Sequence, residues 1–140
     1  MLRLAMIAAA LLLSVSEALA HDEPAAAPKK ELPPVFPVKV AQTRQGPILV
    51  DNKGMTLYTF DRDTGSKSAC DAKCTERWTP LAAPADTPPK GDFTLVTRSD
   101  GSKMWAYRFR PLYTSASDKA PGDTNGFDGA NLWHIARPSL

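Results

Sequence analysis

The fold is decided by the stretch GMTLYTFDRDTGSKSACDAKCTERWTPL, residues 54–81, because its landmarks return 55 positions later in the same order. The triplet Leu-Tyr-Thr at 57–59 recurs at 112–114. Repetition at a fixed spacing predicts two copies of one structural unit that bury a common core. The same gap-free shift takes Asp63 to Asp118, Trp78 to Trp133 and Gly46 to Gly101.

Each unit, about 42–80 and 97–135, is predicted to consist of β-hairpins with long loops. In the first unit the turn-forming residues 51–54 separate two extended apolar runs, at 47–50 and 55–60. In the second, 93–97 leads through a polar turn into 104–109, where alternation places Trp105, Tyr107 and Phe109 on one face. Helix signals are confined to 68–78, so at most one short helix is expected there. The sequence predicts an all-β domain of two repeats with pseudo-twofold symmetry.

The repeated side chains have a structural interpretation. Large aromatic residues allow a loop-rich unit to bury enough area, and an aspartate after a strand can cap the following loop by accepting backbone N–H bonds. The set consists of Tyr58, Phe60, Asp63, Trp78, Tyr113, Asp118 and Trp133.

These motifs resemble the bacterial exported family described as a secreted repeat of unknown function, also described as predicted lipoproteins with a Y-x-(F/W/Y)-x-x-D motif. The resemblance covers Gln42 to Pro138. It includes Cys-x-x-x-Cys before Trp-x-Pro-Leu in the first copy and Pro-Gly-Asp-x-Asn-Gly before Trp-His in the second. The motif falls on Tyr58, Phe60 and Asp63; in the second copy Ser115 stands where the middle aromatic is expected. The resemblance implies a fold and no assigned activity.

The N-terminal segment predicts export. Residues 1–20 combine Arg3, an apolar run and a small-x-small ending, as in a signal peptide cleaved after Ala20. No cysteine follows for lipid attachment, so we expect a periplasmic or secreted protein without a transmembrane anchor. Residues 21–37 contain five prolines and read as a flexible tether before a domain at 38–140. The net charge of +2 does not indicate a nucleic-acid partner.

The two cysteines, Cys70 and Cys74, are predicted to form a disulfide, because an exported chain matures in an oxidising compartment. A redox or metal role is the alternative interpretation. It would favour a closer Cys-x-x-Cys spacing or further ligands nearby.

Two metal hypotheses are open. Asp123, Asn125 and Asp128 alternate with glycine as in calcium loops, although the same residues are common in turns. After cleavage His21 would carry a free α-amino group, and with His134 it could bind copper. Turns and an ordinary histidine on the last strand are the favoured interpretations, so no cofactor is predicted.

A ligand surface is the leading functional hypothesis. Phe60 with Trp105 or Tyr107 could form an exposed aromatic platform for a glycan, a peptide or a small ligand. Asp63 and Asp118 could be imagined as a symmetric acid-base pair, but no sufficient catalytic set is found. We therefore predict a monomeric, non-catalytic binding or interaction module of the bacterial cell envelope. A periplasmic metal-binding or redox accessory protein is the alternative.

Overall fold

The protein folds into short strands joined by long loops. The computed structural model describes residues 36–127 and 132–139, and over those ranges its one helical element is the 3₁₀ turn η1, inside the stretch where a short helix was predicted. The predicted all-β class is confirmed. The elements are β1 (Val38–Thr43), β2 (Gly46–Asp51), β3 (Tyr58–Phe60), η1 (Cys74–Glu76), β4 (Trp78–Pro80), β5 (Ala82–Ala83), β6 (Phe93–Thr97), β7 (Lys103–Tyr107), β8 (Arg110–Pro111), β9 (Tyr113–Ser115) and β10 (Trp133–Ile135).

The signal peptide and all but the last two residues of the predicted tether lie outside the described residues. Those last two residues belong to the domain. Phe36 packs edge-on against Phe93 and Trp105, with ring centroids 4.8 and 5.2 Å apart. The domain therefore reaches further toward the N-terminus than predicted. Within the described ranges, no helix is long and apolar enough to span a membrane.

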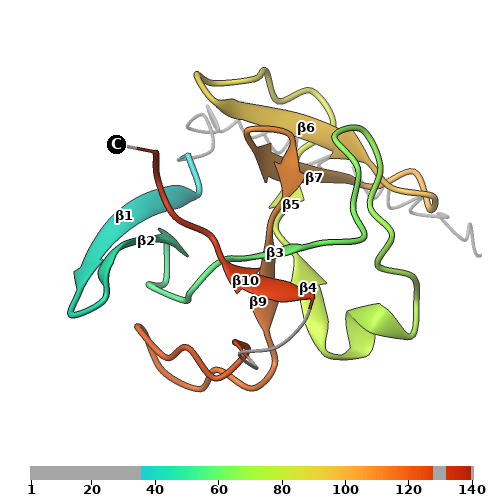
Figure 1. Cartoon of the computed structure of the whole chain (residues 1–140). Coiled ribbons are helices and arrows are strands. Elements are labelled where there is room, and N and C mark those ends of the chain that lie inside the picture. The colour runs from blue at the N-terminus through green and yellow to red at the C-terminus, as the bar shows by residue number, and fades with distance from the viewer. Residues whose placement is uncertain (1–35, 128–131, 140) are drawn as a thin grey trace, which may run out of the picture. The chain divides into compact units, whose positions relative to one another are not determined.

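A four-stranded antiparallel sheet in the order β10-β3-β9-β4 forms the centre of the domain (Figure 1). Its two middle strands pair through Tyr58 and Tyr113, which are equivalent positions of the two repeats. Each outer strand carries the closing tryptophan of one repeat and pairs with one middle strand. The sheet therefore has the predicted pseudo-twofold symmetry. The pseudo-twofold axis passes between β3 and β9 and relates the two halves of the sheet.

Two hairpins flank this sheet, β1-β2 at the left of Figure 1 and β6-β7 at its top. The predicted hairpin of 93–97 with the following strand is confirmed as β6-β7, extended by short pairings of β7 with β5 and β8. The first hairpin prediction was only partly right. A turn does occupy 51–54, closed by a bond from the Gly54 N–H to the Asp51 carbonyl. The long ladder of β2, however, is made with β1, and the run 55–60 contributes only a bridge and β3.

The repeat is not gap-free within the hairpins. Val50 bridges Thr56 in the first unit, and Ala106 bridges Pro111 in the second. Val50 therefore corresponds to Ala106, 56 positions later, whereas Thr56 corresponds to Pro111 at the usual 55. The β6-β7 turn is longer than the β1-β2 turn, so Gly101 lies in a turn while Gly46 begins a strand, and their predicted equivalence was wrong.

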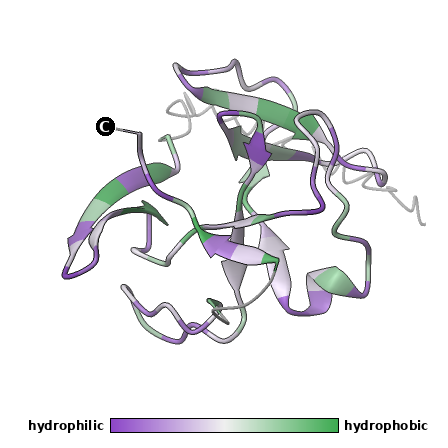
Figure 2. Ribbon diagram, viewed as in Figure 1, coloured by the Kyte–Doolittle hydropathy of each residue, from purple (hydrophilic) through white to green (hydrophobic). Residues whose placement is uncertain are grey.

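The alternation in β7 does not separate a buried face from an exposed face. Trp105 is buried, but Met104 and Ala106 on the opposite face are buried as well. The reason is that two hydrophobic clusters meet at this strand: one contains Trp105 and the other contains its two neighbours. Hydrophobic residues also run along β6, the green strand at the top of Figure 2. The third predicted aromatic, Phe109, lies beyond the end of β7 and is exposed.

The two repeats exchange one hydrogen bond each. The Tyr58 hydroxyl donates to Asp118 Oδ2 and the Tyr113 hydroxyl donates to Asp63 Oδ2, both at 2.8 Å. Both tyrosines are completely buried. A buried hydroxyl without an acceptor costs free energy, and so does a buried carboxylate without donors. Because each repeat supplies the partner that the other needs, neither repeat satisfies its own tyrosine.

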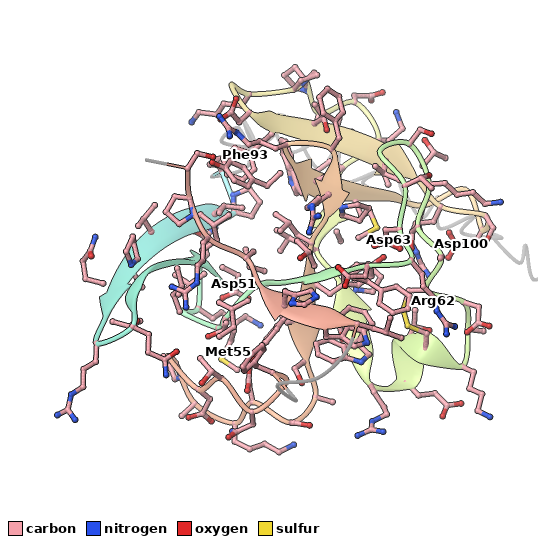
Figure 3. The ribbon with its side chains drawn as sticks, in the orientation of Figure 1. Asp51, Met55, Arg62, Asp63, Phe93 and Asp100 are labelled. Atoms are coloured by element: carbon pink, nitrogen blue, oxygen red, sulfur yellow. A yellow bond between two sulfur atoms is a disulfide. The ribbon has the colours of Figure 1, made fainter. Side chains whose placement is uncertain are left out.

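Each aspartate also holds the loop that follows it, as predicted. Asp63 Oδ1 accepts the Ala69 N–H, and Asp118 Oδ1 accepts the Asn125 N–H, both at 2.7 Å. Figure 3 shows Asp63 on the same side of the molecule as Arg62 and Asp100. The sequence interpretation found these caps but not the tyrosine partners. The loops and the central sheet are thus tied together through the same two carboxylates.

Replacing Tyr58 with Phe removes one exchanged bond and leaves the buried Asp118 with one donor fewer. We expect the free energy of unfolding to fall by about 1.5–3 kcal/mol, the usual range for hydrogen bonds to charged groups. Urea unfolding measures this loss. Tyr107→Phe is the matched control, because the Tyr107 hydroxyl contacts only Ser139 near the exposed C-terminal segment. Equal losses in the two variants would contradict a special role for the exchange.

The exchange also predicts sensitivity to alkali. Burial raises the pKa of both Tyr58 and Tyr113 above the ordinary value of 10.0, and the neighbouring aspartates add to the rise. The folded state therefore keeps these protons to higher pH than the unfolded state. Stability should be fully present below pH 10.0 and should fall above it, by about 1.4 kcal/mol per pH unit for each tyrosine. Unfolding curves between neutral and alkaline pH test this, and Tyr58→Phe should show a shallower decline.

Candidate functional site

Three aromatic rings form a continuous stack over the central sheet. Phe60 on β3 stacks on Trp133 of β10 with centroids 4.3 Å apart, and Trp133 stacks on Trp78 of β4 at 3.7 Å. The interplanar angles are 13° and 5°. The two tryptophans are equivalent positions of the repeats, so the pseudo-twofold relation passes between them.

The surroundings of the tryptophans obey the same symmetry. Tyr58 meets Trp78 edge-on at 5.2 Å, and its equivalent Tyr113 meets Trp133 edge-on at 5.1 Å. Edge-to-face packing at such distances is a favoured aromatic geometry. The two buried tyrosines therefore position both the exchanged hydrogen bonds and the tryptophan pair.

The stack is open at one end because the repeats differ at one position. Phe60 lies directly opposite Trp133 across β3 and β10, and Ser115 lies directly opposite Trp78 across β9 and β4. By symmetry, a ring at 115 would stack on the second face of Trp78 and make the fourth member. Serine supplies no ring there.

A cavity of about 410 Å³ lies at this open end. Trp78, Trp133 and Leu132 give it apolar walls, and Ser115 lies in its lining next to Trp78. Its polar lining residues are Arg77, Ser117 and Asn125. An apolar, largely aromatic cavity with a few polar groups is typical of small-molecule sites. This arrangement can hold a ring against tryptophan and orient its substituents by hydrogen bonds.

Gly126 helps to form the cavity by keeping the 123–127 loop close to the sheet. Its N–H donates to the Tyr58 hydroxyl at 3.2 Å. A Cβ at this position would lie 2.7 Å from Ser115 Cβ and 2.8 Å from the Trp78 ring. Only glycine allows this approach without movement of the neighbours.

A second cavity, of about 400 Å³, lies between β1 and the turn before β6. Its walls are mainly apolar and include Phe36, Val40 and Phe93. Lys90 lies over the Phe36 ring, 4.5 Å from its centroid. Its polar lining residues are Lys39, Lys90, Asp92 and Tyr107, and the stacked tryptophans do not line it.

The predicted platform of Phe60, Trp105 and Tyr107 does not exist as one surface. Trp105 is buried, with 3% of its surface exposed, and it belongs to a different hydrophobic cluster from Phe60. The Tyr107 hydroxyl is bonded to Ser139. Phe60 is instead one end of the ring stack, and one face of its ring lies against Trp133.

The predicted disulfide is confirmed. Cys70 and Cys74 are bonded with their Cα atoms 5.1 Å apart. Cys70 is buried in the same cluster as both tyrosines, and its carbonyl accepts a 2.7 Å bond from the Arg98 guanidinium. The disulfide thereby fastens the long loop of the first repeat to the core.

The described residues of the two metal hypotheses are engaged with other partners. Asp123 Oδ2 accepts the N–H groups of Lys119 and Ala120, which lower the pKa of this carboxyl. The Asn125 amide donates to the Ser117 carbonyl. His134 lies on β10 and pairs through Nε2 with Asp61 at 2.7 Å. His21 and Asp128 lie outside the described residues, and the described residues contain no group of three His, Cys, Asp or Glu side chains that could hold a metal.

Asp63 and Asp118 each face a tyrosine of the other repeat and a loop N–H. Burial raises the pKa of Asp63, and the bonds from Ala69 and Tyr113 oppose that rise. Both carboxylates are thus occupied by interactions that hold the fold.

The sequence interpretation missed Arg77 and Ser117 as parts of a site, and it considered Asn125 only as a calcium ligand. These residues have no counterpart in the repeated motif, and a spacing rule does not select them. The available signal was Ser115 itself, the one motif position at which the second copy lacks its aromatic residue.

A family model described as a secreted repeat of unknown function matches the chain twice, over residues 39–82 and 94–137. Each match contains one hairpin, one of the two middle strands of the central sheet, and the long loop that follows that strand. Together the two matches cover most of the described domain. The family is the one that the repeated motifs resemble. No curated protein and no solved structure matches the chain.

Gly126→Ala should lower the free energy of unfolding by about 1–3 kcal/mol, because the added methyl group overpacks the contact with Ser115 and Trp78. Thermal unfolding followed by tryptophan fluorescence measures this effect. Gly65→Ala is the matched control: Gly65 is exposed, its backbone is not in the left-handed region, and the nearest atom to an added Cβ is 3.2 Å away. A similar loss in both variants would show that the loop is not closely packed at Gly126.

Proposed function

The chain belongs to the family of secreted repeats of unknown function, and from that premise we propose that it is an exported, non-catalytic binding module of the cell envelope. Its ligand is a small molecule with a ring, held at the open end of the aromatic stack. The observation that carries this proposal is the replacement of an aromatic by Ser115 at the one place where a fourth ring would complete the stack.

The cavity has properties that suit such a ligand. Its volume of about 410 Å³ falls within the range of small-ligand sites, roughly 300–1,000 Å³. A ring can lie on the Trp78 indole, and hydroxyl or carboxyl substituents can bond to Ser117, Asn125 or Arg77 at the rim. These three residues are exposed, so a ligand reaches them without unfolding the domain.

A binding role is favoured over catalysis by the state of the acidic groups. Asp63 and Asp118 are bound to tyrosine hydroxyls and loop N–H groups, and these bonds would have to break before either carboxylate could act on a substrate. The cavity beside Trp78 has no acidic residue among its described lining residues.

Export is supported by three features. Residues 1–20 have the pattern of a signal peptide, the family is one of secreted repeats, and the chain's two cysteines form a disulfide. Disulfides persist in oxidising compartments outside the cytosol. Together they favour a site of action in the periplasm or outside the cell.

Ser115→Phe should fill the open end of the stack and abolish ligand binding. The test uses phenol, benzoate and methyl β-glucopyranoside as probes and follows the indole N–H resonances of the three tryptophans by NMR. At least one probe should shift the Trp78 resonance of the native protein while the Trp105 resonance, in the other cluster, stays in place. The Ser115→Phe protein should show no shift, and its melting temperature should fall, because Ser115 is buried and Gly126 packs closely against it.

Two controls accompany this experiment. Thr79→Phe adds the same ring at the exposed neighbouring position of β4 and should leave binding unchanged. Asn125→Ala keeps the backbone N–H that Asp118 accepts but removes the side-chain amide, so it should weaken binding without loss of stability. Equal probe shifts in the native and Ser115→Phe proteins, or no shift with any probe, would refute the proposed site.

A further inference from the structure

A separate feature lies on the hairpin tip between β7 and β8. Phe109 is 66% exposed, more than Val40 and Phe127, the other exposed large hydrophobic residues of the described chain. An isolated apolar residue at a surface is ordinary, but this one also has an unusual backbone.

Two consecutive residues at this tip adopt left-handed backbone conformations. Arg108 has a φ of 47° and Phe109 has a φ of 64°. Because Tyr107 pairs with Arg110, they form a two-residue hairpin turn with positive φ at both positions. Such turns favour Asn-Gly or Gly-Gly, since a side chain in the left-handed region costs free energy. Strain of this kind points to a function when the fold does not require it.

The first repeat shows that the fold does not require it. There the corresponding connection runs through Asn52-Lys53-Gly54, and the residue with positive φ is Gly54, at 82°. The Asp51 carboxylate holds that turn by accepting the N–H groups of Lys53 and Met55. The second repeat has replaced a turn of ordinary composition with Arg-Phe.

The strained tip is held in place from two sides. The Arg108 N–H donates to the Asp92 carbonyl at 2.8 Å, and Arg108 Nε donates to the Asp92 carboxylate at 3.0 Å. On the other side, a Cβ on Gly65 would lie only 3.2 Å from Phe109 Cβ, so the 64–67 turn packs against the base of the ring. Phe109 is therefore fixed in an outward position.

Basic residues lie on both sides of Phe109 in the chain and in the turn that packs against it. Arg108 and Arg110 flank Phe109 in the chain, and Lys67 closes the adjacent 64–67 turn. Lys67, Arg108 and Arg110 are all exposed. Asp92 forms an ion pair with Arg108, so the positive charges of Arg110 and Lys67 are not offset by it. An apolar tip with cations at its base matches the interface of an anionic bilayer, where the ring enters the acyl boundary and the cations meet phosphates.

We infer that the tip formed by Arg108, Phe109 and Arg110, with Lys67 beside it, binds the protein peripherally to anionic phospholipid surfaces. A lipid surface fits better than an acidic protein partner, because Phe109 is the one large exposed hydrophobic residue of the tip and, among residues 36–127 and 132–139, the other two are Val40 and Phe127. Stable protein interfaces bury a larger apolar patch. The inference is independent of the proposed ligand cavity.

The experiment is sedimentation of the chain from His21 onward with large unilamellar vesicles at low ionic strength. Vesicles of equal parts phosphatidylglycerol and phosphatidylethanolamine are compared with vesicles of phosphatidylcholine. The native protein should bind the anionic vesicles selectively, and Phe109→Ala should lower the partition coefficient about tenfold. Arg110→Ser and Lys67→Ser should each lower it about fivefold and reduce its salt dependence.

Phe127→Ala is the matched control, because Phe127 is 48% exposed but lies next to Gly126 and Asp128 in the sequence. It should bind like the native protein. Phe109→Gly removes the ring and introduces a residue that adopts the left-handed backbone without strain. This variant should therefore lose vesicle binding with an unchanged or raised melting temperature. Failure of the native protein to bind anionic vesicles, or equal binding by the Phe109 and Phe127 variants, would overturn the inference. Loss of binding in Ser115→Phe would instead connect it to the ligand cavity and also count against it.

Discussion

The exchanged hydrogen bonds between Tyr58 and Asp118 and between Tyr113 and Asp63 are the interactions on which the rest of this structure depends. Each repeat is too small and too rich in loops to cover a core alone. Its tyrosine is completely buried, and the aspartate that pairs with it is buried in the case of Asp118 and half-buried in the case of Asp63. Polar groups in such positions must be paired. Since the partner always comes from the other repeat, the bonds fix the two units relative to each other and close both long loops on the sheet.

The symmetric frame makes the differences between the repeats informative. Both proposed surfaces lie where one copy departs from the other: Ser115 stands opposite Trp78 where Phe60 stands opposite Trp133, and the Arg108-Phe109 turn replaces a glycine-containing turn. Residues that maintain the symmetry are occupied by packing and hydrogen bonds. Residues that break it line the cavity beside Trp78 and form the exposed tip between β7 and β8, which is why both proposals are placed there.

Much of the fold could be predicted because its causes are local or periodic. The all-β class, the β6-β7 hairpin, the disulfide and the capping role of the two aspartates all follow from spacing and residue type. The surface platform was wrong because alternation in β7 does not reveal that a second cluster covers its other face, burying Trp105. The equivalence of Gly46 and Gly101 was wrong because a longer turn shifts the register within the second hairpin.

The sequence by itself determined that the chain has two copies of one unit, which residues each copy repeats, and that one copy lacks an aromatic residue at Ser115. Only the tertiary structure decided that each tyrosine hydroxyl bonds to the aspartate of the other repeat. Tyr58 and Asp118 are 60 positions apart in the sequence, and Tyr113 and Asp63 are 50 positions apart. At such separations no local pattern selects a partner. The antiparallel pairing of β3 with β9 selects it, because it brings the tyrosines together and places the tryptophans in one stack, leaving the second face of Trp78 without a ring.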